Sequence, residues 1–385
     1  MPKIILGVFM KVAIGLSGGV DSSVAACLLK EQGHEVIGVT MLIWPDSKCC
    51  SGEAVEDAKK VASYLGIEHH IYDLVPEFTK EIVDNFVSEY ANGRTPNPCP
   101  TCNYKMKFHY LWNAVNKMHS NVDKIATGHY VGMGYDEITN RYQLFKGQDK
   151  SKDQSYMLYK LTQDQLSRIH LPLGKMHKKE VRVMAKELGL GKVASKADSM
   201  DLCFTSGNLQ GFLKKMAPEA VIAGDIINTD GKKLGVHEGI MNYTIGQRKG
   251  INVPSSEKLY VVSIDAKTHT IVVGNRDETY SPGLLAEDVS WLSIPKPETP
   301  IYADVKTRYL ANPEPAEIIP IGDDRYKIVF KDNASKLDCR RNLDSWDYQR
   351  AVPIRANTSG CWFCARRSYR RRSSPCSRSP YRKVR

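Results

Sequence analysis

The sequence predicts an α/β fold, with a helix-wrapped parallel sheet in the N-terminal half and mostly β structure after it. Short β-branched and apolar runs alternate with stretches of helical periodicity up to about residue 200. After Cys203, turn signals such as NTDGKK and short strand patterns such as LYVVSID replace the long helical patterns. A chain of 385 residues is also longer than a typical single domain with one hydrophobic core, so two or three domains are expected.

The expected elements follow one another in a regular order. A strand that begins at Lys11 runs into a glycine turn and then a helix, which stops at Gly33. Further strands are expected at residues 35–44, 67–74 and 123–131. Helices are expected at residues 54–66, 76–90, 104–117, 161–169 and 178–190.

The change of pattern along the chain suggests three domains. A catalytic α/β domain is expected at residues 1–205 and a small central domain at 206–280. A C-terminal β-barrel-like domain is expected at 281–385, with an atypical basic tail from about residue 331. We find no internal repeat of 20 to 50 residues.

Composition limits the classes of function. Apolar residues make up 42% of the chain and charged ones 25%, which are ordinary globular values. The net charge of +11 comes mostly from the last 25 residues, which carry nine Lys or Arg and no acid, so it does not by itself indicate a polyanionic partner.

The sequence has no long uncharged apolar run or signal-peptide pattern, so we expect a cytoplasmic protein without membrane contact. The ten cysteines are too dilute for a disulfide scaffold and are expected to be reduced.

The first chemical motif lies between the first strand and its helix. Backbone N–H groups and the positive end of the helix dipole favour a phosphate there, and glycines allow close approach. The alternative interpretation is a tight glycine turn with Ser22 as an N-cap. The complete string SGGVDSS resembles the PP-loop of ATP pyrophosphatases, which implies nucleotide binding through Gly15, Leu16, Ser17, Gly18, Gly19, Val20, Asp21 and Ser22.

The second motif places two cysteines in a proline-rich loop before an expected helix. Cys102 would lie near the helix N-terminus, where the dipole favours its thiolate, and Lys105 and Lys107 add positive charge. Half of a metal site or a pair of buried thiols are the alternatives for Cys99 and Cys102.

Three further segments qualify as candidates. Cys203 lies at the expected domain junction, in MDLCF, where clefts form, although a buried cysteine is the alternative. Gly128 and His129, in TGHY, end an expected strand at the edge where α/β sheets bind ligands. A cation, polar groups and an aromatic in KDQSY suit a nucleic-acid backbone, with a solvated loop as the alternative.

Seven motifs in order (SGGVDSS, TPNPCPTCN, TGHY, KDQSYML, MDLCF, YTIGQRKG and VKTRY) resemble the tRNA-specific 2-thiouridylase family, MnmA or TrmU. This family belongs to the PP-loop ATP pyrophosphatases, and the resemblance covers Met10 to about Phe330. It implies that ATP adenylates O2 of the wobble uridine in tRNA and that sulfur then displaces AMP. It also implies a sulfur-donor protein as partner, either a cysteine desulfurase or a relay protein.

The resemblance implies a role for each matched residue. Cys203 carries a persulfide, Cys102 is the nucleophile, and Asp21 works with Mg²⁺. Met41 and Gly128 join residues 15–22 around ATP. The residues implied to contact tRNA are Asn97, Pro98, Cys99, His129, Lys152, Asp153, Gln154, Arg308 and Tyr309. Some family members have Asp at the position of Cys99, so an acid–base role there does not carry over.

The chain departs from the family beyond about Phe330. The TPGQ segment and the glycine-rich LGGG strand are replaced by an arginine-rich terminus, which suggests a shifted reading frame or a rearranged end and an unclosed barrel with exposed edges. A basic RNA-binding tail, or a metal site from Cys361, Cys364 and Cys376, is a further interpretation.

Three alternatives to the sulfurtransferase stay open. They are a PP-loop ligase of a small metabolite, a tRNA-binding protein inactivated by its C-terminus, and an iron–sulfur cluster on Cys99, Cys102 and Cys203. The oligomeric state cannot be inferred from the sequence.

Overall fold

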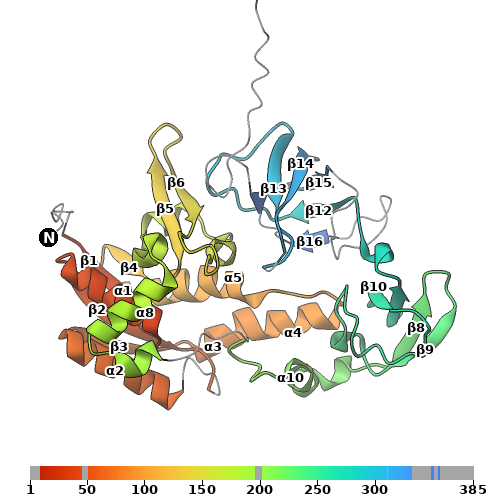
Figure 1. Ribbon diagram of the computed structural model, residues 1–385, viewed down its shortest axis with the longest axis horizontal. Helices are drawn as coiled ribbons and strands as arrows, with labels where there is room; N and C mark the ends of the chain where they lie inside the picture. Colours follow the sequence, from red (N-terminus) through yellow and green to blue (C-terminus); the bar gives the residue numbers. More distant parts are fainter. Residues whose placement is uncertain are drawn as a thin grey trace, which may run out of the picture.

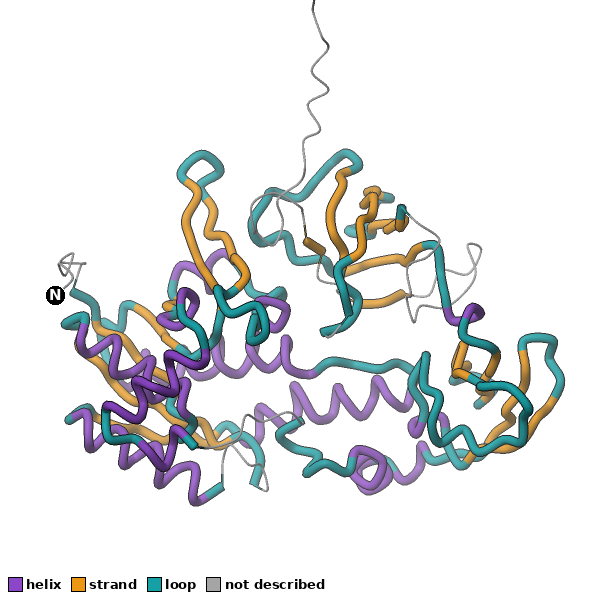
Figure 2. Tube along the Cα trace, viewed as in Figure 1, coloured by secondary structure: helices purple, strands orange, loops and turns teal. Residues whose placement is uncertain are grey.

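The computed structural model describes residues 9–45, 51–195, 202–309, 311–331, 348–350 and 354–355. Figure 1 shows an elongated molecule in three parts: a helix-covered sheet near the N-terminus and two further groups of strands at the other end. Figure 2 shows that helices gather in the first part and strands dominate the other two, as the sequence predicts. The division of the chain at residues 205 and 280 stays a prediction.

The first part is built on a five-stranded parallel sheet in the order β3-β2-β1-β4-β7. Apart from the two-residue β7, these strands were expected. The fourth is shorter than predicted, because the chain leaves the sheet at Thr127. The strands are β1 (Lys11–Gly15), β2 (Glu35–Leu42), β3 (Glu68–Asp73), β4 (Lys124–Ala126) and β7 (Ile169–His170).

Helices cover both faces of this sheet. Val12 and Ile14 of β1 pack with α1 (Val20–Glu31), α2 (Gly52–Leu65) and α8 (Lys178–Glu187), whereas Ala13 packs with the core on the opposite face. This alternation follows from the two-residue period of a strand. Shorter helices complete the first part: η3 (Ser155–Leu158), α7 (Gln163–Ser167), η4 (Pro172–Lys175) and α9 (Gly191–Ala194).

Two long helices, seen side by side across the middle of Figure 1, cover the second face. One runs through α3 (Val75–Phe78), η1 (Thr79–Val83) and α4 (Asp84–Ala91). The other runs through α5 (Pro98–Cys102), η2 (Asn103–Tyr110) and α6 (Leu111–Met118). The predicted start at residue 104 is wrong, because Asn97 caps the helix and Pro98, whose fixed φ suits a first helical position, begins it.

A hairpin of β5 (Val131–Asp136) and β6 (Arg141–Lys146) was not predicted. It joins the first part to the C-terminal strands. Arg141 Nε donates to the carbonyl of Leu292 at 3.1 Å, and Gln163 Nε2 donates to the same carbonyl at 2.8 Å.

The second part has a four-stranded sheet in the order β10-β11-β8-β9 and its own apolar core. It begins with α10 (Leu209–Met216). This helix was not predicted, because mostly β structure was expected after Cys203. Its other elements are η5 (Pro218–Ala220), β8 (Gly224–Asn228), β9 (Lys233–His237), η6 (Ile240–Asn242), β10 (Tyr260–Asp265), β11 (Thr270–Gly274) and η7 (Asp277–Thr279).

The third part is a six-stranded sheet in the order β16-β12-β15-β14-β13-β17. Because β16 and β17 pair with opposite edges and only residues 351–353 separate them, the sheet must curl until its edges lie within about 14 Å of each other. This is a barrel-like form, as predicted. The expectation that its edges would be exposed is wrong for β12 and β13, because β16 pairs with the first and β17 with the second. The strands are β12 (Gly283–Glu287), β13 (Ile301–Val305), β14 (Glu314–Pro320), β15 (Tyr326–Phe330), β16 (Tyr348–Arg350) and β17 (Ile354–Arg355).

Some predictions fall on residues outside the described ranges. They include the start of the third cysteine motif at residues 199–201, and Cys361, Cys364 and Cys376 of the basic tail. No helix among the described residues is long and apolar enough to cross a membrane.

Candidate functional site

A crevice is expected where the order of the parallel strands changes direction. From β1 the sheet continues to β2 on one side and to β4 on the other, so the loops after β1 and β4 flank this switch point at the carboxyl edge. The two loops lie very close together: a Cβ on Gly128 would lie 2.7 Å from the carbonyl carbon of Asp21. Glycine at 128 is therefore needed for the approach of the TGHY loop to the start of α1.

Short-range hydrogen bonds hold the loop after β1 in shape. Gly18 has a φ of +65°, and a Cβ there would lie 2.4 Å from the carbonyl oxygen of Ala54. The Ser22 hydroxyl accepts from the N–H of Ser17 at 3.2 Å and donates to the carbonyl of Gly19 at 3.1 Å. Among the described residues, no side chain caps the start of α1. The helix N-terminus is therefore suited to an external anion.

The other residues predicted around the nucleotide contribute in different ways. The side chains of Leu16 and Val20 are buried in the core behind the loop, so only their backbone can face a ligand. The Thr40 hydroxyl donates to the carbonyl of Leu16 at 2.7 Å and ties the loop to β2. Met41 lies one residue further along β2, next to the same edge of the sheet.

Asp21 is the centre of an ionic cluster at the start of α1. Its carboxylate accepts from the Tyr130 hydroxyl at 2.7 Å and from Lys178 Nζ at 2.7 and 2.8 Å. Lys178 is only 7% exposed, so its charge requires this partner. The sequence analysis did not identify Lys178 as a site residue. The only local feature that marks it is its position at the start of an expected helix.

His129 lies inside the protein. It is 8% exposed, and its Nδ1 lies 2.7 Å from the Thr127 hydroxyl. Burial, with a smaller effect of Lys107, holds the pKa of His129 well below its usual 6.5, so the ring is neutral at pH 7. Its assignment to the residues that contact tRNA stays a prediction.

The second motif forms the first turn of the helix over residues 98–118. The Asn97 side chain accepts from the N–H of Cys99 at 3.1 Å, so Cys99 is nearer the helix N-terminus and Cys102 lies one turn further in. This differs from the predicted position of Cys102. Burial raises the pKa of the Cys99 thiol, and Lys107 opposes that rise. Lys105 forms an ion pair with Glu81.

The thiols among the described residues divide into two kinds. Cys27 is buried inside α1, and burial together with Glu31 raises its pKa to about 11, as expected of a structural cysteine. Cys102 and Cys203 are partly buried and pack against the same core cluster. In that cluster Phe204, which follows Cys203, contacts Phe78 with ring centroids 5.7 Å apart.

Several residues predicted to face tRNA come together around Tyr156. The Asn97 side chain hydrogen-bonds to Tyr156, and the rings of Tyr156 and Tyr309 lie 5.9 Å apart. Burial raises the pKa of Tyr309, and the charges of Asp153, Lys152 and Cys99 act on the same hydroxyl.

The remaining members of this predicted set have structural contacts. Arg308 Nη2 donates to the carbonyl of Ile245 at 2.8 Å. Asp153 accepts from the Ser155 hydroxyl at 2.6 Å, and Gln154 accepts from the N–H of Tyr130 at 2.9 Å. Lys306, in the VKTRY motif, lies over the rings of Tyr156 and Tyr309 at 5.7 and 5.5 Å. The fold thus gathers residues from three distant segments around the buried Tyr156.

The parallel sheet and its glycine- and serine-rich loop define a nucleotide-binding protein of the PP-loop class. Two family models match the chain, described as the tRNA methyl transferase HUP domain, over residues 10–207, and the tRNA methyl transferase PRC-barrel domain, over residues 210–275. The chain belongs to the tRNA-specific 2-thiouridylase family, as its curated relatives establish.

The relatives match over most of their length. The chain is 45% identical to tRNA-specific 2-thiouridylase MnmA of Acetivibrio thermocellus over 330 residues, which cover 83% of this chain and 91% of the relative. It is 44% identical to MnmA of Nostoc punctiforme over 323 residues, with the same coverages. A solved structure, the U34-tRNA thiolase NcsA of Methanococcus maripaludis with its [4Fe-4S] cluster, is 24% identical with a TM-score of 0.34; the match covers 56% of this chain and 70% of that one.

Proposed function

We propose that this chain is an ATP-dependent sulfurtransferase that replaces O2 of the wobble uridine of tRNA by sulfur, giving 2-thiouridine. The observation that carries the proposal is the combination of a PP-loop at a sheet switch point with two partly buried thiols, Cys102 and Cys203, on one core cluster. The loop suits the activation of an oxygen by ATP, and the thiols suit the delivery of sulfur. The relatives named 2-thiouridylase support the same reaction.

In the first half-reaction, residues 15–22, Met41 and Gly128 hold ATP. The uncapped start of α1 fits a polyphosphate, and the close approach of Gly128 leaves the loop N–H groups little freedom to move. A bound Mg²⁺ would neutralise phosphate charge. Asp21 fits that ion because its carboxylate supplies oxygen ligands and is one-third exposed. Lys178 and Tyr130 orient the carboxylate.

In the second half-reaction, Cys203 carries a persulfide that it receives from a sulfur-donor protein. The Cys102 thiolate attacks Sγ of Cys203, the bond to the terminal sulfur breaks, and hydrosulfide leaves with the electron pair. Hydrosulfide displaces AMP at C2 of the uridine, and a Cys102–Cys203 disulfide remains. An external thiol then reduces this disulfide, which suits a cytoplasmic enzyme.

The tRNA substrate approaches the face around Tyr156. Tyr156 itself is buried, but the partly buried ring of Tyr309 and the cations near it suit an unstacked base and its phosphates. The target base must leave the anticodon stack to reach the ATP site. In this proposal the contacts come from Asn97, Pro98, Cys99, His129, Lys152, Asp153, Gln154, Arg308 and Tyr309. His129, which is buried, would act by shaping the loop rather than through an exposed ring.

The test is thiolation by the full chain. We expect unmodified tRNA incubated with ATP, Mg²⁺ and a sulfur donor to gain one sulfur in place of oxygen on uridine, measured by mass spectrometry of the nucleosides. Cys102→Ala and Cys203→Ala should each lower the rate by more than about 10³-fold, because each removes a group that forms a covalent bond in the reaction. Cys27→Ala is the matched control and should keep the rate, since Cys27 is a buried structural thiol.

The same assay separates the alternatives. Full thiolation by Cys203→Ala would contradict the persulfide role, and tRNA binding without any ATP consumption would favour a non-catalytic protein. ATP-dependent amidation or condensation that is insensitive to Cys102→Ala would indicate a ligase. Loss of both activity and visible absorbance in Cys99→Ala would favour an iron–sulfur cluster.

A further inference from the structure

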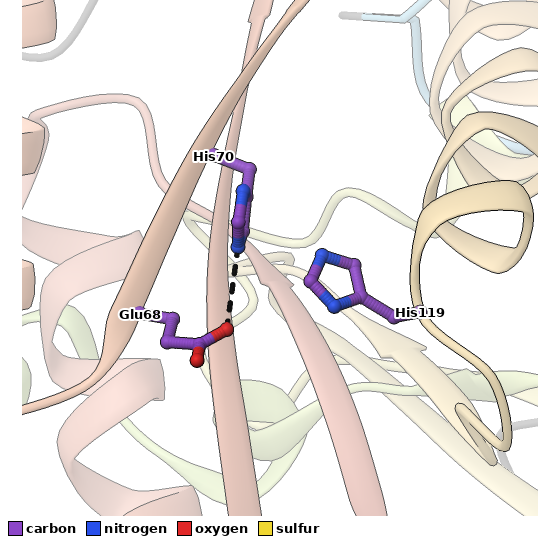
Figure 3. A group of neighbouring side chains, drawn as sticks. All are labelled: Glu68, His70 and His119. Carbon is purple, nitrogen blue, oxygen red and sulfur yellow. Dashed lines mark hydrogen bonds and ion pairs between the residues drawn. The ribbon is translucent and has the colours of Figure 1, made fainter.

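Three potential metal ligands meet beside β3, an edge strand of the parallel sheet. Glu68 and His70 are two residues apart on β3, so their side chains lie on the same face of the strand. His119 directly follows the last helical residue of α6. Figure 3 shows the three side chains pointing toward one another, with His119 reaching across from the helix.

The distances suit a single ion. The three candidate ligand atoms all lie within 4.8 Å of one another, and His70 Nε2 is 3.4 Å from Glu68 Oε2. Tetrahedral Zn²⁺ with bonds of about 2.1 Å places its ligand atoms about 3.4 Å apart. The two imidazole rings have centroids 4.4 Å apart and an interplanar angle of 62°. Small side-chain rotations would bring all three ligands onto one ion.

The surroundings also favour a cation. Nε2 of His119 is buried and has no hydrogen-bond partner among the described residues, a costly state that a metal bond would relieve. His119 lies at the C-terminus of a helix that spans residues 98–118, where the helix dipole is negative. Glu68 adds a carboxylate that is 73% exposed, so the site opens to solvent and leaves room for water as a fourth ligand.

We propose that Glu68, His70 and His119 form a binding site for Zn²⁺ or a similar transition-metal dication. Two imidazoles and one carboxylate are ligands that such ions prefer, whereas Mg²⁺ favours oxygen. The ion would join the edge strand β3 to the C-terminal end of the helix whose first turn carries Cys99 and Cys102. Its role would be structural, since Glu68 and His70 share a face of β3 with Tyr72, which packs in the core on the side of the sheet opposite to α1.

The experiment measures Zn²⁺ binding to the full chain after alkylation of its thiols, because free cysteines would otherwise bind the ion. We expect one tight site by calorimetry, and Co²⁺ should give a visible spectrum that is typical of nitrogen and oxygen ligands. His119→Ala, His70→Ala and Glu68→Gln should each weaken binding by more than about 100-fold, since loss of even an outer partner costs 10- to 100-fold. Exposed His109, on the same long helix, provides the matched control His109→Ala.

A second measurement covers the case in which a histidine variant folds poorly. Zn²⁺ should raise the melting temperature of the alkylated wild-type chain and of His109→Ala, but not that of Glu68→Gln, whose exposed side chain makes unfolding by that change implausible. Tight binding that survives in all three ligand variants would overturn the proposal, as would the absence of binding to the alkylated wild type.

Discussion

At the residue scale, Asp21 and Lys178 form the most constrained ionic pair of the crevice. Lys178 lies 157 positions from Asp21 along the chain, yet its buried ammonium contacts both carboxylate oxygens. A nearly buried charge is tolerated only with a partner of opposite sign, so each group fixes the position of the other. The Tyr130 hydroxyl orients the carboxylate from a third direction.

We expect Lys178→Met to lower ATP-dependent thiolation by at least about tenfold, because Asp21 loses the cation that orients it. The measurement is the rate of pyrophosphate release with saturating tRNA. Lys179→Met removes an exposed lysine one position away and should leave the rate within about twofold. Equal rates for the two variants would show that the ion pair does not support the chemistry.

At the element scale, the helix over residues 98–118 connects the two candidate sites. Its first turn contains Cys99 and Cys102, its middle is the π-helical segment η2, and its end precedes His119. A π-helical segment has a wider hydrogen-bond pattern than an α-helix and frequently occurs at functional sites. The position of both cysteines therefore depends on where this helix begins.

We expect Asn97→Ala to destabilise the protein by about 1 kcal/mol, because the N–H of Cys99 loses its cap. Urea unfolding measures this change, and hydrogen exchange at residues 99–102 should become faster. Asn97→Asp keeps an accepting oxygen at the cap and should retain most of the stability. If the alanine and aspartate variants were equally stable, the cap would not determine the start of the helix.

At the scale of the whole molecule, the three parts contact one another through shared apolar packing and a few specific polar groups. Arg141 and Gln163 of the first part bind backbone carbonyls of the third part, and Tyr156 of the first part packs in the core of the third. The second part contacts the end of α4, where a Cβ on Gly93 would lie 2.9 Å from Ile264. These contacts hold together the residues of distant segments that we propose to face tRNA.

Stability should depend on pH through four buried or half-buried histidines. Burial lowers the pKa of His69, His129, His170 and His237, so the folded protein keeps these rings neutral. At pH values below about 6.5, the ordinary pKa of histidine in the unfolded chain, the unfolded chain binds protons that the folded protein does not bind. The free energy of unfolding should therefore fall as pH drops from about 6.5 toward 5, and change little between pH 7 and 8.

The contribution of His129 can be isolated. His129→Gln should reduce the slope of unfolding free energy against pH below 6.5 by up to about 1.4 kcal/mol per pH unit, because a permanently neutral side chain takes up no proton. His109→Gln alters an exposed ring and should keep the wild-type slope. Urea titrations at several pH values provide the measurement, and an unchanged slope in His129→Gln would contradict the prediction.

Local patterns in the sequence were enough to predict the α/β fold and to single out the two cysteine motifs, whereas the PP-loop was identified by its resemblance to a known family. Strand alternation, helical periodicity and the glycine turn are properties of neighbouring residues, so they can be read directly from the chain. The start of the long helix was predicted six residues too late. The proline-rich segment suggests a loop, although a capped Pro98 is compatible with a first helical turn.

Contacts between distant segments were decided only by the tertiary structure. The pairing of Lys178 with Asp21, the burial of His129, the packing of Tyr309 against Tyr156 and the meeting of His70 with His119 all join residues that are far apart in sequence or face a neighbouring element. A pattern along one segment specifies which face of that segment is apolar. Which other side chains meet that face depends on how the sheet and its helices pack, and that packing completes the candidate sites.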